Sequence, residues 1–182
     1  MLRNEKLYLP EDWESTLELS MLRRPVGIKL ARSYICSPCR ADTAEGVFRN
    51  IKAARVYMHY AYVHFQGVPR APHAYLPILL NDNFEDEREL ALDFGTRLLL
   101  DCDLMLVCGD RLSEGMYGEI VAAVKIKTPV QVFNSSIYDA LRERLASDGH
   151  EHDHPYHDES RRHYALEMGA DELAAYWRDG QL

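Results

Sequence analysis

The stretch that most constrains this 182-residue chain is residues 102–133. Its residues 104–108 form an apolar run that is too short for a helix, which indicates a buried parallel strand. In the polar turn that follows, Ser113 can cap a helix beginning near Glu114. Residues 129–133 return as a second buried strand. A strand, helix and strand in this order close as a right-handed parallel crossover, so we expect an α/β fold.

Helices alternate with short apolar strands through the middle of the chain. This alternation predicts a three-layer α/β/α sandwich on a mostly parallel, Rossmann- or flavodoxin-like sheet. Further strands are expected at 33–36 and 70–76, and further helices at 44–66, 86–101, 137–146 and 164–177. We therefore divide the chain into a helical extension (1–30), an α/β domain (31–147) and a histidine-rich linker with a C-terminal helix (148–182).

The charge and hydropathy of the chain exclude several classes of partner. A formal net charge of −8 argues against a nucleic-acid backbone or an anionic membrane as the main partner. No apolar run approaches the length of a membrane span, and the first residues lack the apolar core of a signal peptide. We expect a cytoplasmic protein.

The cysteines do not have the spacing of a structural zinc site. Cys36 and Cys39 form a C-x2-C pair, but Cys102 and Cys108 lie six residues apart, and one of them lies in a predicted strand. Reduced buried thiols and a redox C-x-x-C pair both remain open.

Four histidines alternate with acidic residues in a segment without apolar periodicity: His150, His152, His154 and His157. Such a segment can capture zinc or nickel adventitiously. A catalytic metal needs ligands fixed by a scaffold, so we expect a solvated linker and no metal site.

Polar residues gather just after the predicted strand at 104–108. Ligands of parallel sheets bind at the carboxyl ends of the strands, where Asp110, Ser113, Gly115 and Glu119 would lie. Glu119, one turn into its helix, could accept hydrogen bonds or attack a substrate.

A second polar loop follows the predicted strand at 33–36. Ser37, Arg40 and Thr43 stand ahead of a helix N-terminus, which suits a phosphate or a sugar hydroxyl. A helix cap with a surface arginine explains the same pattern. His73, in the predicted strand at 70–76, is either a structural residue or a ligand contact at the same edge.

Four motifs in series resemble a known family. They are Tyr-Ile-Cys-Ser-Pro at 34–38, Ala-Pro-His at 71–73, Cys-Asp-x-x-x-Val-x-Gly at 102–109 and Ser-x-Gly-Met-x-x-Glu-Ile at 113–120. In order and spacing they resemble the nucleoside 2-deoxyribosyltransferase superfamily, closest to a bacterial and phage branch of it. Better-known relatives are the deoxyribosyltransferases and the 2′-deoxynucleoside 5′-monophosphate N-glycosidases, which cleave the bond between a base and deoxyribose.

The resemblance implies a site and a mechanism. Glu119 would be the nucleophile that forms a glycosyl-enzyme ester, as in retaining glycosidases. Tyr34 would position the sugar, and Asp93 or Asp110 would be the acid. The implied substrate-binding residues are Ser37, Pro38, Arg40, His73, Gly109, Ser113, Gly115 and Met116. The implied partner is a nucleoside or nucleotide, with no cofactor and no metal.

Two further points come with the resemblance. Relatives place an aspartate that helps to protonate the leaving base where this chain has Gly95, so the proton source is in doubt. Relatives also form dimers, and Trp13, Tyr176 and Trp177 offer apolar surface for a homodimer or a larger homo-oligomer.

Three functional hypotheses therefore remain. The first is a glycosidase or deoxyribosyltransferase. The second is a binding module that senses or sequesters a nucleotide without turnover. The third is an interaction protein in which Glu119 is only a carboxylate stabilised by the helix dipole. A catalytic Glu119 should face Tyr34, whereas a structural one should point to solvent or pair with a surface cation such as Arg111.

Overall fold

A computed structural model describes residues 31–65, 67–81, 84–149, 155–160 and 162–178. The described residues, from 31 onward, form one compact unit. The helical extension predicted for residues 1–30 lies outside the described residues. The elements are β1 (Arg32–Cys36), α2 (Ala44–Phe65), β2 (Val68–Arg70), the 3-10 helix η1 (Pro72–Ala74), α3 (Leu76–Leu79), α4 (Glu85–Leu100), β3 (Leu104–Val107), α5 (Glu114–Lys125), β4 (Val130–Val132), α6 (Ser135–Ser147), α7 (Tyr164–Glu167) and α8 (Ala170–Arg178).

The four strands form one parallel sheet in the order β2-β1-β3-β4. Tyr34 of β1 stands between Arg70 of β2 and Met105 of β3. The α/β fold expected from the sequence is confirmed, and its strand order is that of a flavodoxin-like sheet. The chain leaves β1 toward β2 and leaves β3 toward β4, so the topological switch point lies between the ends of β1 and β3.

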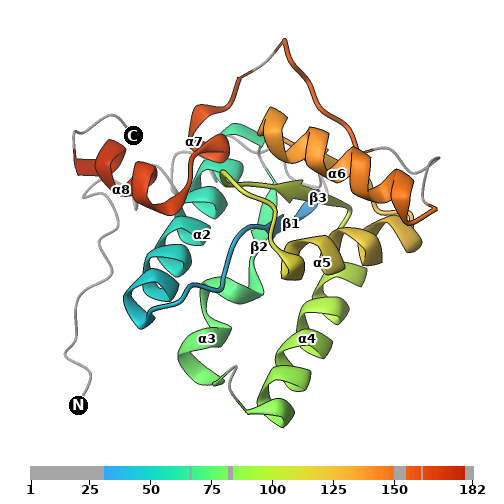
Figure 1. The fold of residues 1–182 in the computed structure, drawn as a ribbon. Coiled ribbons are helices and arrows are strands. Elements are labelled where there is room, and N and C mark those ends of the chain that lie inside the picture. Colours follow the sequence, from blue (N-terminus) through green and yellow to red (C-terminus); the bar gives the residue numbers. More distant parts are fainter. Residues whose placement is uncertain (1–30, 66, 82–83, 150–154, 161, 179–182) are drawn as a thin grey trace, which may run out of the picture. The chain divides into compact units, whose positions relative to one another are not determined.

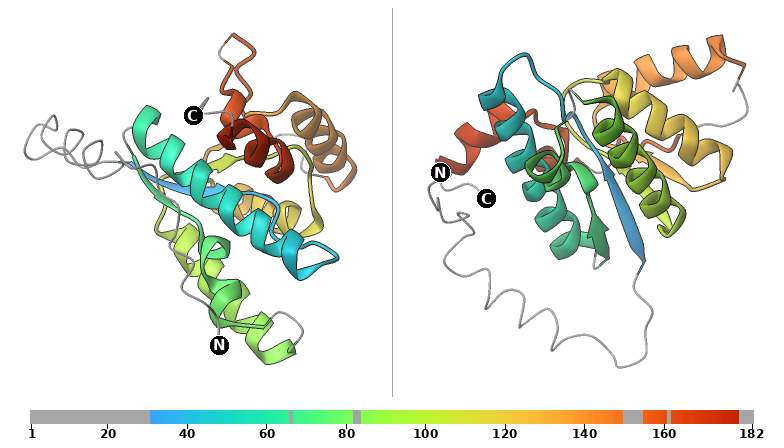
Figure 2. Two further views of the ribbon diagram at one scale, coloured as in Figure 1. Left: turned by 90° about the vertical axis from the view of Figure 1, so that its left-hand side faces the viewer. Right: turned by 90° about the horizontal axis from the view of Figure 1, so that it is seen from below.

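Each face of the sheet is covered by helices (Figures 1 and 2). Tyr34 and Cys36 belong to a buried cluster with residues of α4, α5 and α6. Ile35, between them, belongs to a second cluster with residues of α2, α7 and α8. Because side chains alternate along a strand, β1 supplies both layers of the core.

Two predicted elements differ from the structure. The strand expected at 70–76 lies instead at Val68–Arg70, which overlaps the expected range only at Arg70, and His73 lies in η1. Pro72 lacks the N–H that a longer paired strand needs, which explains why the strand does not continue into 72–76. The final helix is broken at Met168 and Gly169 into α7 and α8.

The segment after α6 is attached to the edge of the sheet. Tyr156 forms a bridge with Gln131, its N–H donates to Val130 O at 2.7 Å, and its carbonyl accepts from Val132 N at 2.8 Å. His157 Nδ1 lies 2.9 Å from the Val132 carbonyl. The prediction of a solvated linker was wrong for this part, whereas His150, His152 and His154 lie outside the described residues.

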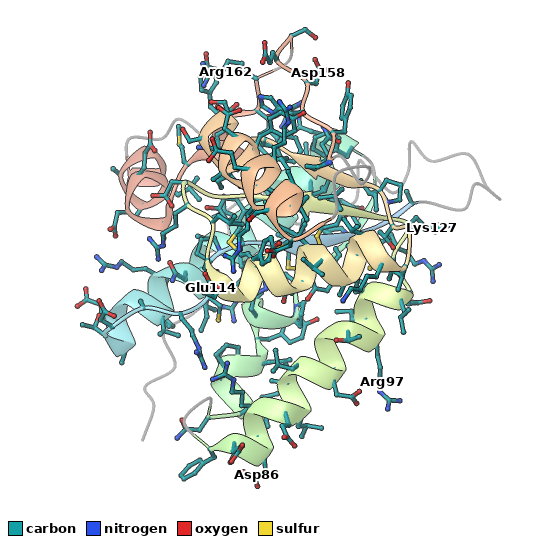
Figure 3. All side chains as sticks on the ribbon, turned by 45° about the vertical axis from the view of Figure 1, so that its right-hand side comes forward. Asp86, Arg97, Glu114, Lys127, Asp158 and Arg162 are labelled. Atoms are coloured by element: carbon teal, nitrogen blue, oxygen red, sulfur yellow. The ribbon has the colours of Figure 1, made fainter. Side chains whose placement is uncertain are left out.

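The outer face of α4 carries charged side chains such as Asp86 and Arg97, and Lys127 lies in the turn after α5 (Figure 3). Among the described helices, none has the length and apolarity needed to cross a membrane.

Candidate active site

The Tyr34 hydroxyl donates a hydrogen bond of 3.0 Å to Glu119 Oε1. Tyr34 is completely buried beneath α4 and α5, and Glu119 is partly buried. Glu119 thus faces Tyr34, as a catalytic role requires, and it forms no ion pair with a surface cation among the described residues.

Burial raises the pKa of Glu119 from 4.5 to about 7 because it penalises the charged carboxylate. Hydrogen bonds from Tyr34 and the Cys36 thiol act in the opposite direction and lower the pKa. Burial, followed by the charge of Glu119, raises the pKa of Tyr34 well above its ordinary value, so the hydroxyl stays protonated and acts as a donor. The site therefore holds one carboxyl group that changes charge near neutral pH.

Cys36 is a site residue that sequence reasoning missed. Its thiol lies within reach of Glu119 and 3.8 Å from the Met116 carbonyl. The signal was its position two residues after Tyr34, because alternate residues of a strand share a face. Burial raises the pKa of the thiol well above its ordinary value, and none of the four cysteines, all of which the structure describes, forms a disulfide. Cys36 is thus a neutral hydrogen-bond donor, not a thiolate.

Gly95 lies beside this pair. A Cβ atom at Gly95 would stand 3.3 Å from Tyr34 Oη and 3.8 Å from Pro72 Cγ. The helix α4 therefore presents position 95 to the site. Asp93, two residues earlier, has a side chain that is 56% exposed and paired with Arg97 at 2.7 Å. The structure does not bring Asp93 to the site.

Asp110 is also directed elsewhere. It is exposed, and its carboxylate lies against Gly169, where it occupies the place that a Cβ would take. It lines a polar cavity of about 230 Å³ together with Arg49 and Asn50 of α2. No contact between Asp110 and Glu119 occurs among the described residues. Asp110 therefore meets the loop before α8, and its predicted role as the acid has no geometric support.

Four of the predicted binding residues come together in two pairs at the carboxyl edge. Ser37 Oγ lies 2.7 Å from His73 Nε2, and both residues are buried. Burial lowers the pKa of His73 to about 4, so its imidazole is neutral at physiological pH. Gly109 has a φ of 108°, and a Cβ there would stand 2.9 Å from Pro38 Cδ, so only glycine fits.

The remaining predicted binding residues have mainly local roles. Ser113 caps α5 by accepting a bond of 3.3 Å from Met116 N, and Met116 itself is core. A Cβ at Gly115 would meet open space. Arg40 is exposed, and its carbonyl accepts from the Asn50 amide.

The described part of the chain has no group of three His, Cys, Asp or Glu side chains that could hold a metal. Glu119 lines neither the polar cavity near Asp110 nor a second cavity of about 250 Å³. Trp13 and the side chains of Tyr176 and Trp177, offered above as a subunit contact, lie outside the description.

Comparisons with known proteins give a family but no activity. The family profile described as "Domain of unknown function (DUF7768)" matches residues 31–133. None of the curated protein sequences matches the chain. A similar solved structure is a conserved protein from Enterococcus faecalis V583, with 15% identity, coverage of 84% of this chain and 99% of that chain, and a TM-score of 0.44.

Proposed function

This chain belongs to the DUF7768 family, a domain of unknown function, and from that premise we propose that it cleaves the base–sugar bond of a nucleoside or nucleotide. The activity would be that of an N-glycosidase or a 2-deoxyribosyltransferase. The observation that carries the proposal is the hydrogen bond between Tyr34 and Glu119 at a partly buried site beside Gly95. A carboxylate held by a tyrosine in this way is suited to attack an anomeric carbon.

The reaction would proceed in two displacements. A Glu119 oxygen forms a bond to the anomeric carbon while the carbon–nitrogen bond breaks, and the electron pair leaves with the base. The resulting ester is then attacked by water in the glycosidase, or by a second base in the transferase, which frees the carboxylate. The Tyr34 hydroxyl orients the nucleophile throughout.

The electrostatics of the site set the pH at which this chemistry operates. Glu119 must be ionised to attack, and burial raises its pKa to about 7, so turnover increases as the pH rises through about 7. Because position 95 is glycine and Asp93 faces solvent, the departing base takes its proton from water. We therefore expect turnover to be slow.

The test is release of free base from a panel of deoxynucleosides and their 5′-monophosphates, followed by chromatography. We expect base release from at least one of them, with the sugar product naming the substrate class. Adding a second free base separates the two activities, because only a transferase makes a new nucleoside. No release across the panel at pH 8 would refute the enzyme proposal.

Tyr34→Phe should move the pH–rate profile to higher pH. The Tyr34 hydroxyl lowers the pKa of Glu119, so removing it raises that pKa further above 7 and shifts the ascending limb upward. The measurement is kcat/KM from about pH 5 to pH 9. An unchanged limb with a lower plateau would mean that Tyr34 acts only on substrate binding.

A binding module that senses or sequesters a nucleotide is the second candidate. The glycine at position 95 favours it, since the site lacks the carboxyl group that would protonate a leaving base. Its signature is a nucleotide that raises the melting temperature without base release. The homo-oligomer expected from the resemblance stays a prediction.

A further inference from the structure

We propose that the polar cavity near Asp110 binds a small zwitterion of the α-amino acid type. The cavity has a volume of about 230 Å³ and is lined by the loop after β1, the first turns of α2, the loop after β3 and the start of α8. The two loops flank the topological switch point, where open parallel sheets bind ligands. Glu119 does not line the cavity, so the inference is independent of the function proposed above.

Both signs of charge line the polar cavity. Arg49 of α2 pairs with Asp171 of α8 at 3.0 Å, so these two charges neutralise each other. Asp110 and Arg111, in the loop after β3, form no ion pair with any residue that the structure describes. A carboxylate and a guanidinium without protein partners in one cavity complement a ligand that carries both an ammonium and a carboxylate.

Asn50 adds an acceptor that is removed from water. It is only 5% exposed, and its Nδ2 donates to the carbonyls of Cys39 at 3.0 Å and Arg40 at 3.3 Å. These two acceptors determine which end of the carboxamide is nitrogen. The other end, Oδ1, accepts no hydrogen bond from the described part of the chain. A buried acceptor without a partner is costly, and a ligand ammonium would satisfy it.

The carboxylate end of the ligand fits Arg111 and the start of α2. A guanidinium binds a carboxylate through two parallel N–H bonds. The helix α2 is 22 residues long, and the positive end of its dipole lies at the cavity, where Thr43 and Gly46 form part of the wall. We therefore place the ligand carboxylate beside Arg111 and the start of α2, and the ammonium beside Asp110 and Asn50.

The size of the polar cavity limits the ligand to a small molecule. Pockets for drug-sized ligands measure roughly 300 to 1,000 Å³, and this cavity is smaller, at about 230 Å³. The walls are also held in place without a ligand. Gly109 N donates to the Leu166 carbonyl at 2.8 Å, and the Tyr57 hydroxyl donates to the Met168 carbonyl. A site fixed in this way avoids much of the ordering cost of binding.

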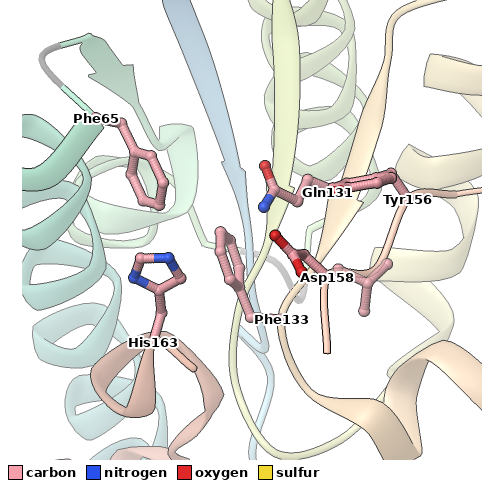
Figure 4. Close-up of a pocket in the computed structure, with 7 residues that line it drawn as sticks. Phe65, Gln131, Phe133, Tyr156, Asp158 and His163 are labelled. Atoms are coloured by element: carbon pink, nitrogen blue, oxygen red, sulfur yellow. The ribbon is translucent and has the colours of Figure 1, made fainter. Parts of the chain in front are cut away.

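The second cavity, of about 250 Å³, has a different character. Figure 4 shows the rings of Phe65, Phe133 and Tyr156 around it. Of the described residues that line it, none is an arginine or a lysine. A ligand carboxylate therefore finds no guanidinium there, and the polar cavity is the better of the two for a zwitterion.

Equilibrium dialysis of the full chain against radiolabelled L-alanine tests the proposal. We expect saturable binding that Asp110→Asn and Arg111→Gln each weaken at least about tenfold, because each substitution removes a charge that meets a ligand charge. Both residues are exposed, so neither substitution disturbs the core. The matched controls are Asp93→Asn and Arg97→Gln, the same changes in an exposed ion pair of α4, and they should leave binding unchanged.

Two analogues of L-alanine test whether both ligand charges are needed. Propanoate lacks the ammonium and ethylamine lacks the carboxylate, so each should bind at least about tenfold more weakly. Propanoate binding as tightly as L-alanine would overturn the proposal by showing a plain anion site. Ethylamine binding as tightly would overturn it by showing a plain cation site.

The remaining outcomes concern the place of binding. Glu119→Gln, which prevents the proposed turnover, should bind L-alanine as the wild type does. Loss of binding in that variant would assign the ligand to the candidate active site and contradict the proposal. Absence of saturable L-alanine binding, or equal binding by the wild type and Asp110→Asn, would also refute it. None of these results depends on whether the protein releases a base.

Discussion

Glu119→Gln is expected to reduce base release by about 10³-fold or more, because the amide cannot act as the nucleophile. The same substitution should stabilise the fold at alkaline pH. In the wild type, the folded-state pKa of Glu119 is about 7 and exceeds the unfolded value of 4.5. Between these pH values the native state therefore binds more protons than the unfolded state. The stability that protonated Glu119 contributes is complete below about pH 4.5 and is lost as the pH rises through about 7.

Glu119→Gln removes this loss. At 1.36 kcal/mol per pKa unit, the stability of the variant relative to wild type should be about 2 kcal/mol greater at pH 8 than at pH 5. Urea unfolding at both pH values measures the difference. Glu114→Gln is the matched control on α5, because Glu114 is exposed and paired with Arg144 at 2.7 Å. It should leave base release intact and show no gain in stability from pH 5 to pH 8.

The two readouts separate the two roles of Glu119. If Glu119→Gln loses activity and gains stability at alkaline pH, the wild-type protein keeps this carboxylate for chemistry at a cost to the fold. Wild-type base release by Glu119→Gln would refute the nucleophile assignment. A stability difference that does not change between pH 5 and pH 8 would show that burial does not destabilise the charged carboxylate.

Gly95→Asp should raise base release about 10²-fold, the usual contribution of a positioned general acid. The new carboxyl group would begin 3.3 Å from Tyr34 Oη, in the partly buried site that already raises the pKa of Glu119. A second carboxylate there is held protonated near neutral pH by burial and by the charge of its neighbour. It can therefore supply the proton that the leaving base otherwise takes from water.

Gly95→Asn is the matched control, since it has the same shape and no acidic proton. The predicted quantity is the ratio of the aspartate to the asparagine variant, which cancels the crowding that both side chains cause near Tyr34 and Pro72. Single-turnover base release at pH 6 to 7 measures it. Equal rates would show that protonation of the base does not limit the reaction.

The sequence predicts the fold better than the site, for physical reasons. Buried strands and amphipathic helices are local patterns, so β1, β3, α2, α4 and α5 follow from residue spacing. The pairing of Tyr34 with Glu119 followed from the motifs. The orientation of α4 did not, because a helix turns 100° per residue and either Asp93 or Gly95 could have faced the sheet.

Contacts between distant segments were beyond the reach of sequence patterns. Asp110 meets Gly169, and Gly109 N donates to the Leu166 carbonyl at 2.8 Å. Both contacts exist because α7 and α8 return to the carboxyl edge of the sheet. No periodicity near Asp110 shows this return, so the sequence alone leaves Asp110 as a reasonable candidate acid. Cys36 differs, since strand alternation alone could have revealed it.

The attachment of Tyr156 to β4 has a consequence for the behaviour of the protein at high concentration. An exposed edge strand offers unpaired N–H and C=O groups on which another chain can assemble. Here the chain occupies that edge itself through Tyr156, and at the opposite edge β2 has three residues, one of them Pro69. A proline lacks the N–H that an incoming strand would need. Both edges of the sheet are therefore poor templates for aggregation.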